Sequence, residues 1–356
     1  MKPKLSVVMA VYNGQRTLRQ AVDSILAQTL RDFEFIVVDD FSHDGTEEIL
    51  RSYRDPRLLA VRNAANLGQT RSLNVGCRLA RGELIARMDA DDYSFPERLA
   101  RQWEYMRRNH EVAALGTGGV VWDCDGREVE PVTPCLNDTE IYTKIFSETV
   151  MIHVSAVIRA DAMAELGYYN ESYLTAQDYD LWSRMLRLRK RIRNLPDPLV
   201  AYRADPRSYG RSRSRTTLPE ELIRIMLANI VALTNLTVEV EQARGLVDVF
   251  ATGGMSLSEE EFHDALGLYS SIFNNLRPEI RRLIADDRLA RSTLSDCLAR
   301  RAVVLLRRGH VRALYHHLAF GSSPGQYRVP YRSQSIRVLS RTLARHAARM
   351  ARAWTA

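Results

Sequence analysis

The sequence predicts an α/β protein with a mainly parallel sheet flanked by helices, followed by an all-α C-terminal region. In the first hundred residues, short apolar runs alternate with stretches of helical periodicity, which is typical of βαβ units. Beyond Leu218 only helical periodicity is found. The composition, 46% apolar and 26% charged over 356 residues, indicates a globular protein and excludes the disordered, collagenous and coiled-coil classes.

Four apolar runs in the first half are predicted to be the parallel strands of the sheet. They are Leu5–Val11, Phe33–Val38, Leu58–Val61 and Leu84–Met88. Leu18, Val22, Ile25 and Leu26 recur at helical spacing after the first run, and another helix is expected near 46–53. In such sheets ligands bind beyond the carboxyl ends of the strands, so the polar residues that follow each run are the first candidates for chemistry.

The region that follows has shorter predicted strands and one amphipathic helix. The strands are Ala113–Val121, Val154–Ile158 and Leu199–Arg203, and the helix is Asp178–Leu188. We expect residues 1–110 and 111–215 to be two halves of one domain. A helical domain at 216–335, with helices near 222–233, 259–273 and 294–306, and a basic amphipathic helix at 336–356 complete the predicted organisation.

The net charge of +7 is unevenly distributed along the chain. Twelve arginines and no acidic residue follow Asp296, so residues 1–296 carry 38 basic against 43 acidic side chains. Within 336–356 the apolar and arginine side chains fall on opposite helix faces, which predicts peripheral binding to an anionic membrane surface. The alternative is a helix docked on the helical domain with its arginines in solvent. A nucleic-acid partner is disfavoured because no recognition module is found.

Cysteine usage and hydropathy indicate a cytoplasmic protein. Cys77, Cys124, Cys135 and Cys297 lie far apart without a CxxC pair, which predicts neither a zinc site nor a disulfide framework. The first apolar run is too short for a secretory signal, and no stretch approaches the roughly 18 apolar residues of a membrane-spanning helix. We therefore expect a cytoplasmic location, with the basic helix placing the protein on the inner face of the cell membrane.

The strongest local signal is Asp89-Ala90-Asp91-Asp92, where a strand delivers three acids within four residues. Neighbouring carboxylates repel each other, so the cluster is costly unless a cation lies among them. Magnesium is commonly held by one or two carboxylates together with substrate phosphates. The alternative is a solvated turn that leads into a helix, with Ser94 as N-cap and Pro96 in the first turn.

Two further acidic sites follow the same logic. Asp39-Asp40 ends the second strand, where a carboxylate can accept hydrogen bonds from a nucleobase or a ribose. Asp178 lies at or just before the start of a helix whose apolar stripe contains Leu181, Met185 and Leu188. Its two readings are an N-cap and a general base. No GxGxxG or Walker loop follows either early strand, which disfavours dehydrogenases and P-loop enzymes.

Five segments in order resemble the family 2 inverting glycosyltransferases. They are Ser6–Gly14, Phe33–Thr46, Asn66–Gly68, Met88–Asp92 and Gln177–Trp182. Any one of them is a weak signal, whereas all five together are highly specific. The resemblance covers about residues 3–215 and implies a GT-A fold, with a Rossmann-like sheet, a nucleotide-sugar donor and a divalent cation.

The resemblance assigns roles to the residues that match the motifs. Donor contacts are expected from Ala10, Tyr12, Asn13, Asp40, Arg71, Asp89 and Asp91. Within this set Tyr12 is expected to stack on the base, Asp40 to bind a uracil-type ring and Arg71 to contact the nucleotide. Asp89 and Asp91 match the DxD element that holds Mn²⁺ or Mg²⁺, and Asp178 matches the catalytic base.

On the acceptor side the resemblance points to His153 and Gln177. Similar enzymes often have His-Pro-Ser/Thr where this chain has Val154 after the histidine, and Glu where it has Gln177. A purely structural role for His153 is equally open. Asp205 stands where the family usually has His. The QxxRW element of processive enzymes is not found, so the transfer of one sugar or a few is expected.

The resemblance therefore implies metal-dependent, inverting sugar transfer from a nucleotide sugar, with UDP favoured, to a glycan or lipid-linked acceptor in cell-surface or exopolysaccharide biosynthesis. Two alternatives are a catalytically silent nucleotide-sugar-binding subunit and a polyanion- or nucleic-acid-binding protein that uses the arginine-rich tail, with 209–215 as a further arginine-rich segment. The helical region is also a candidate oligomer interface.

Overall fold

The computed structural model describes residues 2–123, 125–203, 218–252 and 256–284. The chain divides into two compact units. The first comprises residues 1–145 and 149–221, and the second comprises 146–148 and 222–356. The first unit thus contains both predicted halves of the sheet domain, apart from residues 146–148, and every candidate site residue.

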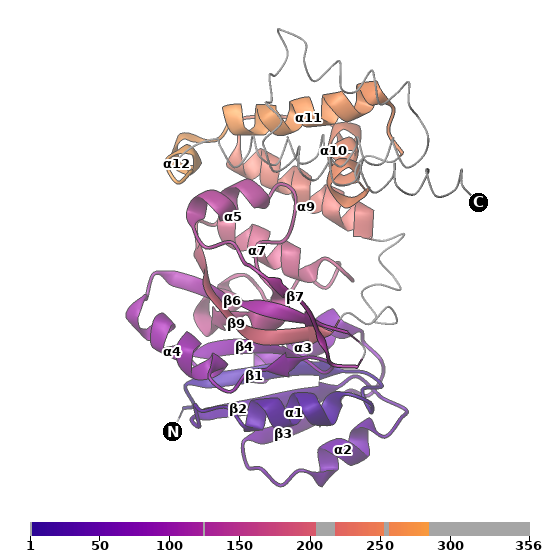
Figure 1. Cartoon of the computed structure of the whole chain (residues 1–356), viewed down its shortest axis with the longest axis vertical. Helices are drawn as coiled ribbons and strands as arrows, with labels where there is room; N and C mark the ends of the chain where they lie inside the picture. Colours follow the sequence, from indigo (N-terminus) through magenta and orange to yellow (C-terminus); the bar gives the residue numbers. More distant parts are fainter. Residues whose placement is uncertain (1, 124, 204–217, 253–255, 285–356) are drawn as a thin grey trace, which may run out of the picture. The chain divides into compact units, whose positions relative to one another are not determined.

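Within the described residues the first unit is built on one nine-stranded sheet, in the order β3-β2-β1-β4-β8-β6-β9-β5 with β7 paired to β6 (Figure 1). Four strands are mutually parallel: β1 (Leu5–Val11), β2 (Phe33–Asp39), β3 (Leu58–Arg62) and β4 (Leu84–Asp89). The helices between them are α1 (Leu18–Leu26), α2 (Thr46–Ser52) and α3 (Gln69–Leu79). Every residue of β1 and β2 is buried, which explains their nearly continuous apolar runs. The strands predicted here are confirmed.

The rest of the sheet mixes parallel and antiparallel pairing. Its strands are β5 (Tyr93–Ser94), β6 (Val112–Trp122), β7 (Glu128–Val132), β8 (Val157–Arg159) and β9 (Arg191–Arg203). β8 runs antiparallel to β4 and β6, whereas β9 runs parallel to β6. The accompanying helices are α4 (Arg98–Arg108), α5 (Asp138–Lys144), the 3₁₀ helix η1 (His153–Ser155), α6 (Ala160–Glu165) and α7 (Gln177–Arg187). The α/β class is confirmed, with a sheet that is parallel in its first part and mixed in its second.

Two local predictions in this part are wrong. The strand expected at Val154–Ile158 begins three residues later, because Ser155 closes a 3₁₀ turn in which its hydroxyl donates to the carbonyl of Ile152 (2.8 Å). Ser94 does not cap the next helix. It lies in β5, paired with β9, and the N-cap of α4 is Glu97.

The second unit is helical over its described residues. Helix α9 (Leu218–Leu233) begins in the first unit and continues into the second, where α10 (Val240–Thr252), α11 (Glu259–Asn274) and α12 (Pro278–Arg281) follow. Ser258 and Glu261 form a reciprocal capping box at the start of α11. The helices predicted near 222–233 and 259–273 are confirmed.

Several predictions fall on parts of the chain that lie outside the described residues. These are the helix near 294–306, the basic helix at 336–356, the arginine-rich segment at 209–215 and the position of Asp205. Along the stretches that are described, no helix combines the length and the apolar character needed to cross a membrane.

Candidate active site

The carboxyl ends of β1 and β4 open onto a cavity of about 540 Å³ in the first unit. Parallel pairing brings these ends level, since Ala10 of β1 lies opposite Asp89 of β4. Nine of the ten predicted site residues line the cavity: Ala10, Tyr12, Asn13, Asp40, Asp89, Asp91, His153, Gln177 and Asp178. The site therefore lies where the strand-end rule places it.

Arg71 is the predicted residue that does not line the cavity. Its side chain is 57% exposed, and its Nε lies 3.4 Å from a carboxylate oxygen of Glu171. Arg203, at the end of β9, does line the cavity, and its Nε donates to the backbone carbonyl of Asp91 (3.1 Å). The sequence offered one signal for Arg203. This residue ends the predicted strand Leu199–Arg203, and most of the candidate acids likewise lie at the ends of predicted strands.

The three aspartates at the end of β4, Asp89, Asp91 and Asp92, differ in their surroundings. Burial and the neighbouring Asp89 carboxylate raise the pKa of Asp91 to about 6. Burial together with the other two carboxylates also raises the pKa of Asp92, which accepts the backbone N–H of Arg203 (2.9 Å). The buried Arg87 guanidinium forms an ion pair with Asp89. The raised pKa values reflect the cost of ionising adjacent buried acids, and a nearby positive charge lowers such a cost.

The oxygen donors at this end of the cavity fit a hard divalent cation. Asp89 and Asp91 both line the cavity, and carboxylate oxygens are the ligands that Mg²⁺ and Mn²⁺ prefer. Throughout the described part of the chain, no group of three or more His, Cys, Asp or Glu side chains forms a complete ligand set. Two carboxylates suit a cation that completes its coordination with substrate phosphates and water.

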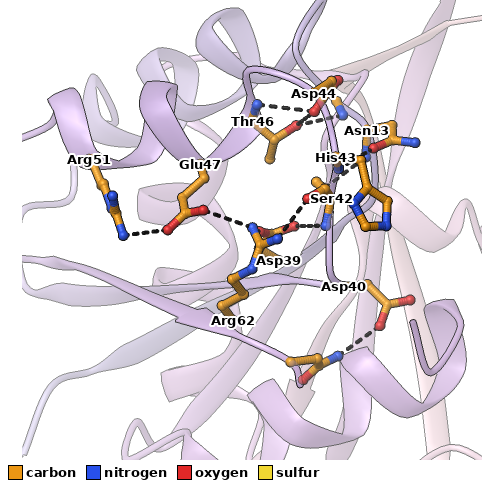
Figure 2. Close-up of polar contacts among 12 residues, drawn as sticks. Asn13, Asp39, Asp40, Ser42, His43, Asp44, Thr46, Glu47, Arg51 and Arg62 are labelled. Carbon is orange, nitrogen blue, oxygen red and sulfur yellow. Dashed lines mark hydrogen bonds and ion pairs between the residues drawn. The ribbon is translucent and has the colours of Figure 1, made fainter. Parts of the chain in front are cut away.

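Figure 2 shows that the two acids at the end of β2, Asp39 and Asp40, have different partners. Asp39 accepts from Arg62, whose Nη1 lies 2.6 Å from its Oδ2. Asp40 is buried and accepts the backbone N–H groups of Leu67 and Gly68, each at 2.8 Å. Gly68 has a φ of 86°, a region that favours glycine. Of the two acids, Asp40 lines the cavity.

The loop after β1 is held by the loop after β2 (Figure 2). The backbone N–H of Asn13 donates to Ser42 Oγ, and Asn13 Oδ1 accepts from the backbone N–H of His43, both at 2.9 Å. Asn13 therefore braces the cavity wall through one backbone bond and one side-chain bond. Tyr12, which precedes it, lines the cavity and is 48% exposed, which leaves a ring face for stacking.

Asp178 is the second residue of α7. Its pKa is raised to about 6 by burial, against the lowering effect of the backbone N–H groups at the helix start. The N-cap of the helix is Ala176, so the reading of Asp178 as the N-cap is wrong. Leu181 and Met185 are buried as predicted, whereas Leu188 is 55% exposed, contrary to expectation. A carboxylate with this pKa is ionised at pH 7 yet more basic than an exposed aspartate, as a general base requires.

His153 lies in η1 and lines the cavity. Burial, assisted by the positive charge of Arg87, lowers its pKa to about 3, so the ring is neutral at pH 7. Its Nε2 lies 2.9 Å from the hydroxyl of Tyr169. This position combines a structural hydrogen bond with access to the cavity, and both roles considered from the sequence are compatible with it.

Two glutamine amides connect the acidic ends of the site. Gln69 Nε2 donates to Asp89 Oδ1 (3.3 Å), and Gln177 Nε2 donates to Gln69 Oε1 (3.2 Å). Because Asp89 Oδ1 accepts from Gln69, the amide oxygen of Gln69 is left to accept from Gln177, so Asp89 orients both amides. Gln177 Oε1 is buried and has no hydrogen-bond partner among the described residues. Gln69 was not predicted, and its only sequence signal is that it directly follows the Asn66–Gly68 segment.

Comparisons with known proteins identify the family. The sequence model described as Glycosyl transferase family 2 matches residues 6–167. An uncharacterized glycosyltransferase of Methanocaldococcus jannaschii is 34% identical over 217 residues, which cover 60% of this chain and 74% of the relative. The amylovoran biosynthesis glycosyltransferase AmsE of Erwinia amylovora is 30% identical over 233 residues, which cover 63% of this chain and 85% of AmsE. The chain belongs to glycosyl transferase family 2.

Solved structures support the fold of this glycosyltransferase. S. aureus TarS 1–349 in complex with UDP-GlcNAc matches with a TM-score of 0.56 at 20% identity, over 86% of this chain and 92% of that one. Mannosyltransferase PcManGT from Pyrobaculum calidifontis, in complex with GDP-Man and Mn²⁺, matches with a TM-score of 0.52 at 17% identity. The match covers 97% of this chain and 86% of PcManGT. At these identities the likeness shows the fold alone, and it confirms the GT-A type of architecture.

Proposed function

We propose that this glycosyltransferase moves one sugar from a UDP-sugar to a hydroxyl of a glycan or lipid-linked acceptor, with inversion at the anomeric carbon. The observation that carries the proposal is that Asp178 shares one cavity with Asp89 and Asp91. In this arrangement Asp89 and Asp91, at the end of β4, would hold the cation that binds the diphosphate, and Asp178 would take the proton of the acceptor hydroxyl. A silent binding module has no need for an acid of raised pKa at this place in the cavity.

Relatives support the substrate classes. TarS is solved with UDP-GlcNAc, and PcManGT is solved with GDP-Man and Mn²⁺. Asp40 offers a carboxylate at the cavity to a ring N–H, which uracil and guanine both possess, and UDP is preferred here on the resemblance at Asp40. The name of AmsE places that relative in amylovoran biosynthesis, which supports an exopolysaccharide-type acceptor for this chain.

The chemistry follows from the position and basicity of Asp178. Its carboxylate accepts the proton of the acceptor hydroxyl while the hydroxyl oxygen bonds to the anomeric carbon. The bond from that carbon to the diphosphate oxygen breaks in the same displacement, and its electron pair leaves with the nucleoside diphosphate. A single displacement inverts the carbon and needs no second carboxylate nucleophile. Mn²⁺ or Mg²⁺, bound by Asp89 and Asp91, would supply positive charge where the leaving group becomes negative.

A donor panel with Mn²⁺ or Mg²⁺ tests the proposal. We expect transfer or slow donor hydrolysis from one UDP-sugar, loss of both in Asp91→Ala, and donor binding without turnover in Asp178→Asn. Asp125→Asn is the matched control, because Asp125 is exposed and does not line the cavity. Transfer at the wild-type rate by Asp178→Asn would show that the base is assigned wrongly. Donor binding without turnover in the wild type, with every acceptor tested, would favour the silent subunit.

A further inference from the structure

Glu221 belongs to none of the sequence motifs, yet its carboxylate binds residues 174–176, the segment that leads to the proposed base. The residue is 4% exposed and lies in the first turn of α9. Its Oε1 accepts the backbone N–H of Leu174 (2.7 Å), and its Oε2 accepts those of Thr175 (3.0 Å) and Ala176 (2.8 Å). All four residues belong to the first unit. One side chain thus binds three consecutive N–H groups.

These bonds fix the entry of the chain into α7. Residues 174–176 precede the helix, so their N–H groups have no carbonyl partner in its hydrogen-bond ladder. Ala176 is the N-cap and offers no side-chain cap. A carboxylate is also favoured near a helix N-terminus because of the helix dipole. Glu221 therefore holds, from 45 residues further along the chain, the turn that sets where Asp178 begins its helix.

The same carboxylate orients a hydroxyl on the cavity wall. Thr175 lines the cavity, and its Oγ1 donates to Glu221 Oε2 (2.7 Å). A hydroxyl has a single proton, so this bond leaves only lone pairs for a ligand. A substrate hydroxyl or amide N–H can donate to Thr175, whereas a substrate carboxylate at this point would meet an acceptor.

We propose that Glu221 is a positioning residue for sugar transfer. It holds residues 174–176 so that Asp178 faces the acceptor, and it turns Thr175 into a hydrogen-bond acceptor for a substrate hydroxyl. The site is therefore suited to a neutral sugar at this point and disfavours a uronic acid there. This inference rests on the proposed function, because it takes Asp178 as the base.

Glu221→Gln, Glu221→Ala and the control Glu220→Gln test the positioning role. Gln keeps the length but replaces one acceptor oxygen by a donor, so at least one of the four bonds is lost. We expect kcat to fall about tenfold in Glu221→Gln and about a hundredfold in Glu221→Ala, the size expected when one or two such bonds no longer hold a reacting group. Nucleotide affinity should stay within about twofold, since Asp40 and Tyr12 are held by other strands. Glu220 is the exposed neighbour on the same helix, and its variant should match the wild type.

Hydrogen exchange and a second pair of variants complete the test. Amide protection at 174–176 should be lost in Glu221→Gln and kept in Glu220→Gln. Thr175→Val should raise the acceptor KM, and Thr175→Ser should restore it. A Glu221→Gln enzyme with unchanged kcat, or one that loses nucleotide affinity in parallel with kcat, would overturn the positioning role. If the wild type transfers no sugar from any donor, the proposed function fails, and hydrogen exchange alone still decides whether Glu221 holds the segment.

Discussion

Replacing the proposed base by its amide should stabilise this glycosyltransferase while removing its activity. Burial raises the pKa of Asp178 from 3.8 to about 6. In the unfolded chain the carboxyl ionises near its ordinary value, so over the interval between about pH 4 and pH 6 the folded protein binds this proton more tightly. The native state therefore loses stability as the pH rises through that interval, and the loss persists above it.

The size of the effect follows from the shift. About two pKa units correspond to roughly 3 kcal/mol of free energy of unfolding. Solvent at the open side of the cavity screens the carboxylate and reduces this cost, so we expect the free energy of unfolding of Asp178→Asn to exceed that of the wild type by about 1–2 kcal/mol at neutral pH. In a unit of this size each kcal/mol raises Tm by about 2–4 °C. At about pH 3, roughly one unit below the ordinary pKa, the carboxyl is almost fully protonated in both states, and the gain should vanish.

Unfolding of both proteins across a pH series measures this difference. Asp91 and Asp92 titrate in both proteins, so their contributions cancel in the comparison. Asp125→Asn, which changes an exposed acid, should show no such pH dependence. An Asp178→Asn protein that is less stable than the wild type at neutral pH, or that keeps its full gain at about pH 3, would refute the argument from burial.

Three further predictions concern other parts of the chain. Gly14→Ala should lower the free energy of unfolding, measured in urea, by about 1–3 kcal/mol, because the added Cβ would lie 2.4 Å from a valine carbon. The control is Gly267→Ala in α11, where a Cβ would meet no atom within 4 Å beyond its chain neighbours and the backbone of its own helix, and it should be neutral or stabilising. Arg87→Met removes a cation that opposes the burial-driven rise in the pKa of Asp178, so the acidic limb of kcat should move to higher pH, and an unmoved limb contradicts this. Deleting residues 336–356 should release the protein from anionic liposomes in a flotation assay. Flotation equal to that of the full chain would contradict the prediction that this segment is the membrane anchor.

The acids on the cavity could be located from sequence because the signals are local. The apolar runs of β1, β2 and β4 are recognisable without knowing their partners, and parallel pairing brings their carboxyl ends to one edge of the sheet. Asp40, Asp89 and Asp91 follow such runs, and all three line the cavity. Asp178 follows no strand, and its choice as the base came from the resemblance of the Gln177–Trp182 segment.

The failures have a local cause as well. The alternative interpretation of the acidic segment predicts Ser94 as a helix cap, because serine is a common N-cap residue, but pairing with β9 places Ser94 in a strand. Leu188 continues the apolar spacing of α7, yet it comes after the last helical residue and is exposed. The spacing of apolar residues identifies which side of a helix faces the core. It does not show at which residue the helix ends or how far the packing against that side extends.

By itself the sequence determined the α/β class, the buried strands and the acids that follow them, since each of these depends on a few consecutive residues. The tertiary structure alone decided that Arg71 pairs with Glu171 while Arg203 lines the cavity. It also decided that Glu221 holds the segment before Asp178. These choices depend on burial and on contacts between residues far apart in the chain, which no local pattern records.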